Sequence, residues 1–456
     1  MLMCGFVASM NAATWYVDSS ATGSKNGTSW ANAWTNVDQV SGTSANDIVY
    51  ISGGPAGSSR TYALRAAWVP KNGVTYKIGQ DAAHNGIATF DANSSTDWIH
   101  GALSNVVISG DAGDGSRHFA LGSVAHVIWG DGSSHVRISY VNCGPRTDGF
   151  QFNGVREIEL DHCYFYKLNG GEDHAVFINN TVQAWDDSKF HDNVIYLPRK
   201  DNGFGDDGIQ GASDGFSFYN NAVIGYLTTY TGGQHQDGLQ PLGGSYLKFY
   251  SNYFQDIANY PIFGDALFAD FAHFWVYDNI VVLTSSALQA SDPPQGIAIG
   301  PDGGSFGQLG RWPRFTDVVV ANNLVADYRG HAAINLRNNP GQSSTFTQCS
   351  VINNIIINSS GIGVAGSVTT ASNISIALSS GSGHFVRYTP SASNNDFHLL
   401  ASDTTFRGKG TNLSAYFSTD KDAKLRAPTG AWDIGPYVYS AYNAPPPPAN
   451  LRVVTP

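Results

Sequence analysis

Five segments of the sequence each begin with a carboxylate or an imidazole and continue as a short, mostly apolar stretch. They start at Asp148, His174, Asp207, Asp237 and Asp265. Two neighbouring carboxylates can do acid–base chemistry when one keeps a proton and the other is ionised. Asp207 and Asp237 are therefore the candidate catalytic pair. Asp206, beside Asp207, is a third candidate carboxylate, and His235 is a candidate orienting or proton-tuning group.

A structural role competes with this interpretation, because Asp-Gly is a common turn dipeptide and an aspartate can bind turn amides. For Asp148 or Asp265 alone, the structural role is favoured. It is less satisfactory for Asp207 and Asp237, because stacked strands about 4.8 Å apart would place like charges side by side. A proton, a cation or a substrate would have to relieve that repulsion.

The residues around these aspartates favour a sugar ligand. Alternation directs Phe150, Val176, Ile209 and Leu239 inward and leaves Gln151, Phe177, Gln210 and Gln240 outward. Longer loops and an insertion add basic and aromatic side chains, and sugar rings stack on aromatic faces. The expected substrate-binding residues are Asp148, Gln151, His174, Gln210, Gln240, Arg199, Lys200, Tyr230 and Trp312.

An asparagine repeat indicates which elements position these side chains. Asparagine follows a short β-branched or aromatic run at Asn193, Asn221, Asn252, Asn279, Asn323 and Asn354, with steps of 28, 31, 27, 44 and 31 residues. Periods of this length with short strands are typical of a solenoid. The sequence predicts an all-β, right-handed parallel β-helix over residues 14–440. The asparagines should form an internal ladder at a bend, where they can tolerate a left-handed backbone.

Composition excludes several classes of function. The chain has 456 residues, of which 13% are charged, and a net charge of −11, so neither nucleic acid nor an anionic membrane is an expected partner. The 4 cysteines form no CxxC pair or zinc motif. Residues 1–13 are interpreted as the remnant of a secretory signal, and residues 441–456 as a proline-rich linker to a further module. We expect a secreted, extracellular bacterial protein that is monomeric.

The ends of the repeat region add a family resemblance. Trp15-Tyr-Val-Asp18, Gly27-Thr-Ser-Trp30 and Trp432-Asp-Ile-Gly435 resemble the usual ends of pectate-lyase-like secreted β-helix proteins. This resemblance implies cleavage of glycosidic bonds in a polysaccharide, bound in an open groove. The same superfamily also contains epimerases, adhesins and tail spikes, so the fold alone does not give the function.

Three functions remain open at this stage. The first is a glycoside hydrolase, and Thr147-Asp148-Gly149, Asp206-Asp207-Gly208 and His235-Gln-Asp237 are similar to pieces of the polygalacturonase pattern. An extra coil between the first two pieces, and the absence of Gly-His-Gly and Arg-Ile-Lys, argue against a galacturonan substrate. No cofactor is required for this function.

The second function is a polysaccharide lyase, in which Arg199, Lys200 and Arg146 would neutralise a uronate carboxylate. Asp206, Asp207 and Asp237 could then hold a Ca²⁺ ion, which would also relieve the repulsion between the carboxylates. The third is a non-catalytic, glycan-binding adhesin. The acidic net charge favours the hydrolase with a neutral glycan.

Overall fold

The computed structural model describes residues 12–144, 146–166, 174–178, 183–197, 207–225, 237–257, 259–284, 295–301, 304–328, 332–390 and 392–440. For residues 146–148, 177–178 and 183–184 it describes the backbone only. The expected signal remnant, apart from its last two residues, and the expected linker therefore lie outside the described residues. Ala13 belongs to the folded part, because its backbone N–H donates to Asp47 Oδ1 at 2.8 Å.

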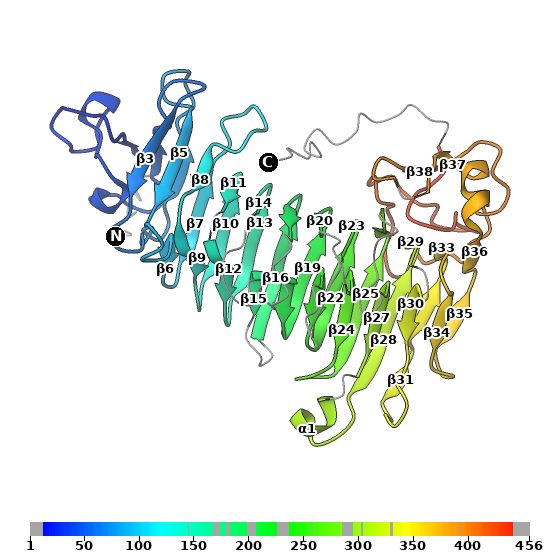
Figure 1. The fold of residues 1–456 in the computed structure, drawn as a ribbon. Helices are drawn as coiled ribbons and strands as arrows, with labels where there is room; N and C mark the ends of the chain where they lie inside the picture. Colours follow the sequence, from blue (N-terminus) through cyan, green and yellow to red (C-terminus); the bar gives the residue numbers. More distant parts are fainter. Residues whose placement is uncertain are drawn as a thin grey trace, which may run out of the picture.

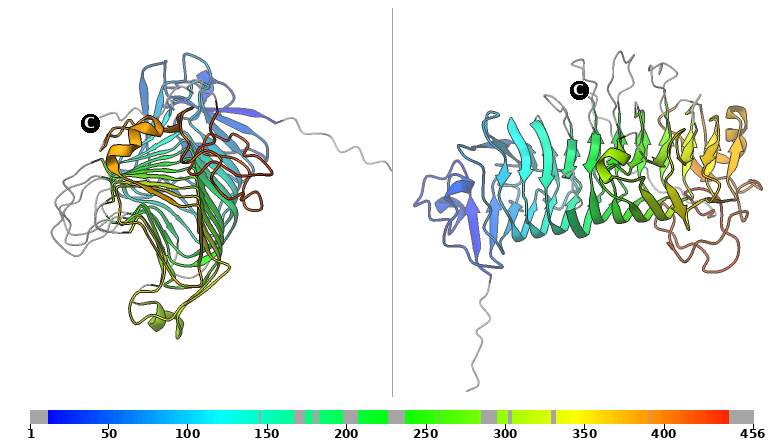
Figure 2. Two further views of the ribbon diagram at one scale, coloured as in Figure 1. Left: turned by 90° about the vertical axis from the view of Figure 1, so that its right-hand side faces the viewer. Right: turned by 90° about the horizontal axis from the view of Figure 1, so that it is seen from below.

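The chain winds into coils, each of which contributes in turn to three long sheets, which we name A, B and C. Neighbouring strands in all three sheets are parallel and come from successive coils. The coils stack along one axis in Figure 1, and the end-on view in Figure 2 shows the three sheets enclosing one interior. The fold is therefore the parallel β-helix that the sequence predicts, of the right-handed type that parallel crossovers almost always adopt.

Each sheet runs through most of the coils, and its strands follow one another in chain order. Sheet A contains β1 (Thr14–Val17), β2 (Ile48–Ile51), β4 (Thr75–Ile78), β7 (Ser104–Ser109), β10 (Ser134–Ser139), β13 (Arg156–Asp161), β16 (Gln183–His191), β19 (Ser213–Tyr219), β22 (Gly244–Tyr250), β25 (Phe271–Tyr277), β28 (Arg314–Ala321), β31 (Thr345–Thr347), β32 (Ser350–Ile352) and β35 (Thr369–Ala371). Sheet B contains β3 (Ser59–Ala63), β5 (Ile87–Asp91), β8 (Phe119–Leu121), β11 (Val141–Cys143), β14 (Tyr164–Phe165), β17 (Val194–Tyr196), β20 (Ala222–Ile224), β23 (Tyr253–Gln255), β26 (Ile280–Val282), β29 (Leu324–Ala326), β33 (Ile355–Ile357) and β36 (Ile374–Ile376). Sheet C contains β6 (Ile99–His100), β9 (Val124–Trp129), β12 (Arg146–Phe152), β15 (His174–Ile178), β18 (Asp207–Gly211), β21 (Leu239–Pro241), β24 (Ile262–Asp265), β27 (Ile297–Gly300), β30 (Ile334–Leu336) and β34 (Ile362–Val364).

Few other elements occur in the described part of the chain. Short 3₁₀ turns lie at η1 (Trp30–Asn32), η2 (Val37–Gln39) and η3 (Leu378–Gly383), and β37 (Phe385–Arg387) pairs with β38 (Asp396–Leu399). The helix α1 (Ser305–Leu309) belongs to the insertion between β27 and β28 and projects away from the coils in Figure 1. No described helix has the length and apolar character that a membrane span requires.

The interior is filled by the apolar side chains that alternation directs inward. In sheet C, Phe150, Val176, Ile209 and Leu239 are all buried, as the sequence predicts. Each such side chain contributes about 1.5–3 kcal/mol on burial. Because successive coils pair in register, every inward residue packs on the equivalent residue of the next coil, so the core is continuous from coil to coil. The described cysteines Cys143, Cys163 and Cys349 are thiols buried in this core.

The repeated asparagines lie at the bend between sheets A and B, with side chains pointing into the structure. The Oδ1 atom of Asn221 accepts from the backbone N–H of Asn193 at 2.9 Å and from its Nδ2 at 3.0 Å. The same two bonds recur between each following pair, from Asn221 through Asn354 to Asn373, which the sequence pattern missed. Each amide thus satisfies backbone groups that the bend would otherwise bury without partners.

The expected left-handed backbone is found one residue earlier than predicted. The residue before each ladder asparagine has positive φ, for example 56° at Asp192 and 54° at Asn220. The ladder asparagines are not among the residues with positive φ. The bend therefore separates two tasks: the outward residue makes the sharp turn, and the inward asparagine makes the hydrogen bonds. Aspartate, asparagine and serine fill the first position because they tolerate this conformation.

The segment after β38 returns along the solenoid and covers part of its outer surface. Arg426 Nη2 donates to Asp278 Oδ1 at 2.7 Å, and both side chains are 1% exposed. The ring of Phe417 stacks on Tyr277 with 4.2 Å between centroids. Sheet C is separate from this covering: the hydrophobic clusters that the segment joins contain sheet A and sheet B residues but none from sheet C strands.

Candidate functional site on the outer face of sheet C

A column of polar residues marks the place where successive coils enter sheet C. Strand pairing puts His126 beside Asp148 and His174 beside Asp207. For the other members, the strand pairs that are observed lie two residues later in each coil, for example Ile209 with Leu239, and the same register places Asp207 beside Asp237. This edge column consists, in coil order, of Asp97, His126, Asp148, His174, Asp207, Asp237, Tyr260 and Gln295. Its members come from eight consecutive coils.

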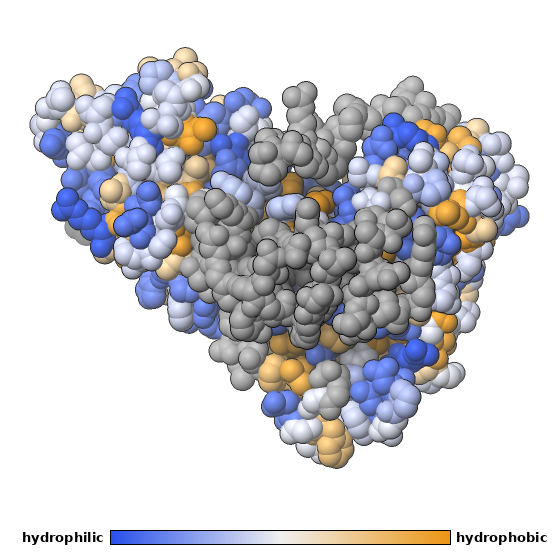
Figure 3. Space-filling model, viewed as in Figure 1, coloured by the Kyte–Doolittle hydropathy of each residue, from blue (hydrophilic) through white to orange (hydrophobic). Residues whose placement is uncertain are grey.

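A second column lies three residues later in each coil, on the outward side of the strands. This face column consists of His100, Trp129, Gln151, Phe177, Gln210, Gln240 and Phe263. Contacts within single coils join the two columns. Gln210 Nε2 donates to Asp207 Oδ2 at 3.0 Å, and the rings of Tyr260 and Phe263 stack with centroids 4.4 Å apart. These contacts join the two columns side by side. Figure 3 shows the molecular surface in the view of Figure 1, coloured by hydropathy.

The carboxylate of Asp207 is 3% exposed and is held from two directions. Its Oδ1 accepts the backbone N–H of Asp237 at 2.8 Å, and its Oδ2 accepts the amide of Gln210. His174 Nδ1 lies 3.8 Å from Asp207 Oδ2. Hydrogen-bond donors to a carboxylate favour its ionised form. These donors therefore hold the Asp207 carboxylate in a fixed position.

The carboxyl group of Asp237 is fully buried. Its Oδ1 accepts the backbone N–H of Tyr260 at 3.0 Å, which repeats the bond made by Asp207 one coil earlier. Burial disfavours the charged form of a carboxyl group. In the edge column, Asp207 and Asp237 are two acidic residues that are direct neighbours. Elsewhere an imidazole separates the acids.

The glycine after each of these aspartates is needed for close packing of coils. A Cβ atom on Gly208 would lie 2.2 Å from the carbonyl oxygen of Gly238, and one on Gly238 would lie 2.4 Å from that of Pro261. Neither glycine has a positive φ. The repeated Asp-Gly is thus not a turn signal of the expected kind. The glycine lets the backbone of the next coil approach closely, so that the aspartate can accept a backbone N–H from that coil.

Further hydrogen bonds follow in the coils after Asp237, and they include Asn335, which pairs with Ala298 in the row of the face column. Gln295 Nε2 donates to the hydroxyl oxygen of Tyr260 at 2.8 Å, and Asn335 Nδ2 donates to Gln295 Oε1 at 2.8 Å. In the face column, Gln210 Nε2 also donates to Gln240 Oε1 at 2.7 Å. Amides and hydroxyls held in this way present fixed donors and acceptors, which is what recognition of sugar hydroxyls requires.

The structure brings many of the predicted residues together. Asp207, Asp237, His174, Gln210 and Gln240 share one face, and Gln151 is in the same register row. The backbone of Asp148 lies in the edge column. The predicted residues outside the described part of the chain are Asp206, His235, Arg199, Lys200 and Tyr230.

Two expectations about the site differ from the structure. Asp265 does not continue the column of Asp237, because it pairs with Gly300 at the end of β24, and Tyr260 takes the expected place. The turn before β24 is shorter than the spacing of the other repeats suggests. Trp312 lies in the insertion after β27, where its ring contacts Phe306 at 5.4 Å. It thus follows the end of β27, whereas the edge column lies at or near the beginnings of the sheet C strands.

Comparison with known proteins gives a likeness of fold at low identity. No protein-family model matches the sequence, and no curated protein matches it either. The pectate lyase Pel9A has a TM-score of 0.47 and 13% identity, covering 94% of this chain and 97% of its own. A family 28 exopolygalacturonase of Yersinia enterocolitica has a TM-score of 0.39 and 11% identity, covering 80% and 76%. The chemistry of this chain therefore has to come from its own residues.

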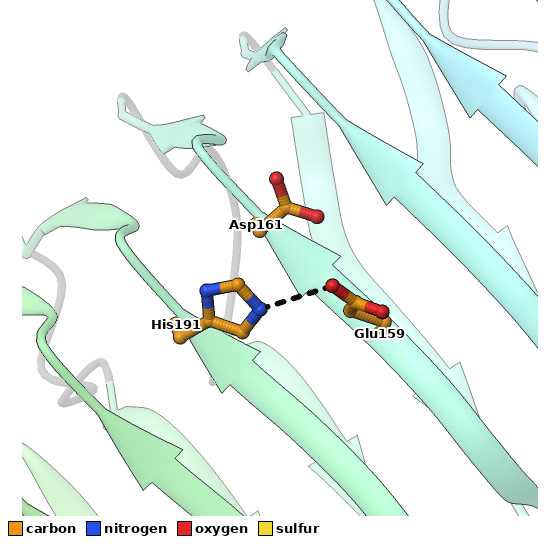
Figure 4. Close-up of side chains that lie close together, drawn as sticks. All are labelled: Glu159, Asp161 and His191. Atoms are coloured by element: carbon orange, nitrogen blue, oxygen red, sulfur yellow. Dashed lines mark hydrogen bonds and ion pairs between the residues drawn. The ribbon is translucent and has the colours of Figure 1, made fainter.

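A different group of side chains on sheet A has the composition of a metal site. One ligand atom each from Glu159, Asp161 and His191 lie within 4.8 Å of one another, as Figure 4 shows. Arg137 already fills this place with a cation: its Nε donates to Asp161 Oδ2 at 2.8 Å, and its Nη2 donates to Oδ1 at 3.1 Å. His191 donates to Asp192 and lies 3.2 Å from Glu159. The group is a closed ion-pair network on another sheet.

The sequence prediction missed the first coils of the site. Asp97, His100, His126 and Trp129 precede the first recognised repeat, so the pattern did not include them. The available signal was the spacing: His126-Val-Ile-Trp129 has the same three-residue step between columns as Asp207-Gly-Ile-Gln210. Tyr260, Gln295 and Asn335 were not among the predicted site residues because the site was defined by its acids, although Gln295 begins a segment equivalent to that of Asp237.

Proposed function

We propose that the protein cleaves glycosidic bonds of a polysaccharide bound along the outer face of sheet C. The reaction is hydrolysis by the Asp207 and Asp237 pair. The single observation that supports this proposal is the juxtaposition of these two buried carboxyl groups in successive coils, each anchored to the next coil by a backbone N–H.

The environments of the two aspartates suggest different roles. Asp207 accepts two hydrogen bonds and lies near His174, so it acts as the ionised base or nucleophile. Asp237 is more deeply buried and keeps the proton that it gives to the leaving glycosidic oxygen. Gln210 positions Asp207. The burial of Asp237 would also suit a purely structural carboxyl group. Asp237→Asn separates the two roles, because it should abolish most turnover if Asp237 is the acid and leave turnover unchanged if Asp237 is structural.

The proposed substrate is a neutral glycan. The net charge of −11 disfavours a polyanion, and acidic residues recur along the edge column. The partly exposed amides of Gln151 and Gln210 are suited to sugar hydroxyls, whereas Gln240 is buried and accepts a hydrogen bond from Gln210. A lyase would need cations for a uronate, and its predicted Arg199 and Lys200 lie outside the described residues. Secretion remains a prediction from the sequence.

A screen of neutral and uronate polysaccharides tests this function. Both new reducing ends and the ultraviolet absorbance of an unsaturated product are measured, because only a lyase gives the second. We expect reducing ends from a neutral polysaccharide, no absorbance, and unchanged rates with EDTA. Unsaturated product from a uronate polymer, with loss of activity in EDTA, would establish the lyase with Ca²⁺. Binding without any cleavage would establish the adhesin.

A further inference from the structure

The first coils of sheet C hold two imidazoles on one carboxylate. His100 Nδ1 donates to Asp97 Oδ2 at 2.8 Å, and His126 Nδ1 donates to Asp97 Oδ1 at 2.6 Å. Asp97 is itself 8% exposed, whereas the side chain of His100 is 56% exposed. A buried acid thus anchors a ring that stands out from the sheet.

This anchoring determines the tautomer of His100. Burial alone would raise the pKa of Asp97, but hydrogen bonds from His126 and His100 lower it below its ordinary value. An ionised carboxylate can only accept, so Nδ1 of His100 carries the proton. In the neutral ring Nε2 is then an acceptor. The exposed edge of His100 can therefore receive a hydroxyl proton.

Trp129 stands beside His100 in the next coil and is fixed on several sides. The two residues are paired across β6 and β9, and their ring centroids lie 5.9 Å apart. The rings of His126 and Trp129 are nearly perpendicular, at 83°, with centroids 5.3 Å apart. The indole Nε1 donates to Asp131 Oδ2 at 3.3 Å, and Asn153 Nδ2 donates to Asp131 Oδ1 at 2.7 Å. Trp129 is only partly buried, so a rigid aromatic surface remains exposed.

We propose that Trp129 and His100 form a sugar-binding subsite, in which an uncharged sugar ring stacks on the indole and donates a hydroxyl proton to His100 Nε2. Asp97 is the positioning residue of this subsite. The inference rests on the proposed function, because it extends the same face toward the N-terminus. Gln151 pairs with Trp129 and continues the face column toward Gln210. The bound chain would thus lie across the coils, along the solenoid axis.

The charge of this group selects the class of sugar. Asp97 and Asp131 are both within contact of the proposed subsite residues, and the neutral imidazole offers an acceptor. A uronate carboxylate would meet the like charges of Asp97 and Asp131, whereas a neutral ring meets no such repulsion. The subsite therefore favours neutral glycans over uronate oligomers at neutral pH.

Binding measurements test the subsite without requiring turnover. The full chain carrying Asp207→Asn is titrated at neutral pH with xylan, β-1,4-glucan and β-1,3-glucan hexasaccharides and with hexagalacturonate, using calorimetry. We expect a neutral hexasaccharide to bind more tightly than hexagalacturonate. Adding Trp129→Ala should weaken that binding by about tenfold or more, and His100→Ala by severalfold. Binding without cleavage by the unsubstituted protein would refute the hydrolase while leaving the subsite standing.

A matched control and a spectroscopic measurement complete the test. Trp30 in η1 stacks on His84, which pairs with Asp81 in the turn between β4 and β5. Trp30→Ala should leave hexasaccharide affinity unchanged. In ¹⁵N-histidine spectra, His100 should be the Nδ1–H tautomer, and Asp97→Asn should release it and lower the affinity. Equal affinity of the Trp129→Ala variant, tighter binding of hexagalacturonate, no binding of any hexasaccharide, or an Nε2–H tautomer would each overturn the proposal.

Discussion

The carboxylate of Asp207 accepts the backbone N–H of Asp237, the residue that takes its place one coil later, at 2.8 Å. One side chain therefore both fixes the spacing of two coils and stands at the candidate reaction centre. Any test of its chemistry must preserve the acceptor, because removing it would leave a buried N–H without a partner at a cost of about 1–3 kcal/mol. Asparagine preserves it and alanine does not.

The hydrogen bond from Gln210 to Asp207 should matter for turnover more than for folding. In Gln210→Ala, Asp207 keeps its backbone partner but loses its side-chain donor. A hydrogen bond to a charged group contributes about 1.5–3 kcal/mol, so turnover should fall roughly ten- to hundredfold. Steady-state kinetics and melting temperature are compared with those of Gln151→Ala. A large drop in melting temperature with unchanged turnover would show Gln210 to be structural.

The asparagine ladder should be more sensitive to substitution in the middle than at its end. Asn252→Ala removes the acceptor of the buried backbone N–H of Asn221 and one donor to the carbonyl of Phe218. Each buried group without a partner costs about 1–3 kcal/mol. Asn373→Ala removes the last, partly exposed member and should cost less. Urea unfolding of both variants measures the difference, and equal losses would contradict a ladder that works by burial.

The ion pair between Arg426 and Asp278 should hold the C-terminal segment on the solenoid. Arg426→Met would leave a buried carboxylate without its cation, which costs about 3–5 kcal/mol. Burial raises the pKa of Asp278, so the loss should grow with increasing pH. The exposed pair of Arg311 and Asp270 is the matched control, and Arg311→Met should cost less than about 1 kcal/mol. Thermal unfolding at two pH values measures the loss of stability in each variant. Equal losses for Arg426→Met and Arg311→Met would contradict the role of the Arg426–Asp278 pair in holding the C-terminal segment.

His398 should make stability depend on pH in the alkaline range. Burial opposes its protonation, but hydrogen bonds to Asp396 and Asp422 raise its pKa from 6.5 to about 9. Protonated His398 therefore stabilises the fold fully below its unfolded pKa, and this contribution is lost as pH rises through about 9. The contribution is on the order of 3 kcal/mol. His398→Gln should remove the difference in unfolding free energy between pH 6 and pH 10 that this group causes, and an unchanged difference would exclude it.

The fold could be predicted because its signals repeat in equivalent environments. Each ladder asparagine occupies the same bend and makes the same two hydrogen bonds, so the same residue recurs from coil to coil. The inward residues such as Ile209 and Leu239 are fixed by the same alternation. The residue before the asparagine varies chemically, and its left-handed backbone is a property of the turn. Because only the asparagine recurs, the left-handed conformation was predicted for the asparagine and not for the residue before it.

The site was only partly predictable because its face is not repetitive. Asp207, Asp237, His174 and the two glutamines were found since they accompany well-defined repeats. Asp265 was misassigned because the segment before β24 is shorter than in the neighbouring coils. The residue beside Asp237 is therefore Tyr260, and the inward apolar pattern gives no sign of this change in length. Asp97 and His126 come from coils without the asparagine signal. The position of Asp97 beside His126 follows from the register of β6 on β9, which the sequence pattern does not show.

The most direct test of the account is the turnover of Asp207→Asn and Asp237→Asn on a neutral polysaccharide that the unsubstituted protein cleaves. Each substitution keeps the side-chain acceptor for the next coil and removes the ionisable group. Turnover should fall by about 10² to 10⁴ or more in each variant, with circular dichroism and melting temperature close to those of the unsubstituted protein. Near-normal turnover in either variant, with the fold intact, would contradict the assignment of these two aspartates as the catalytic pair.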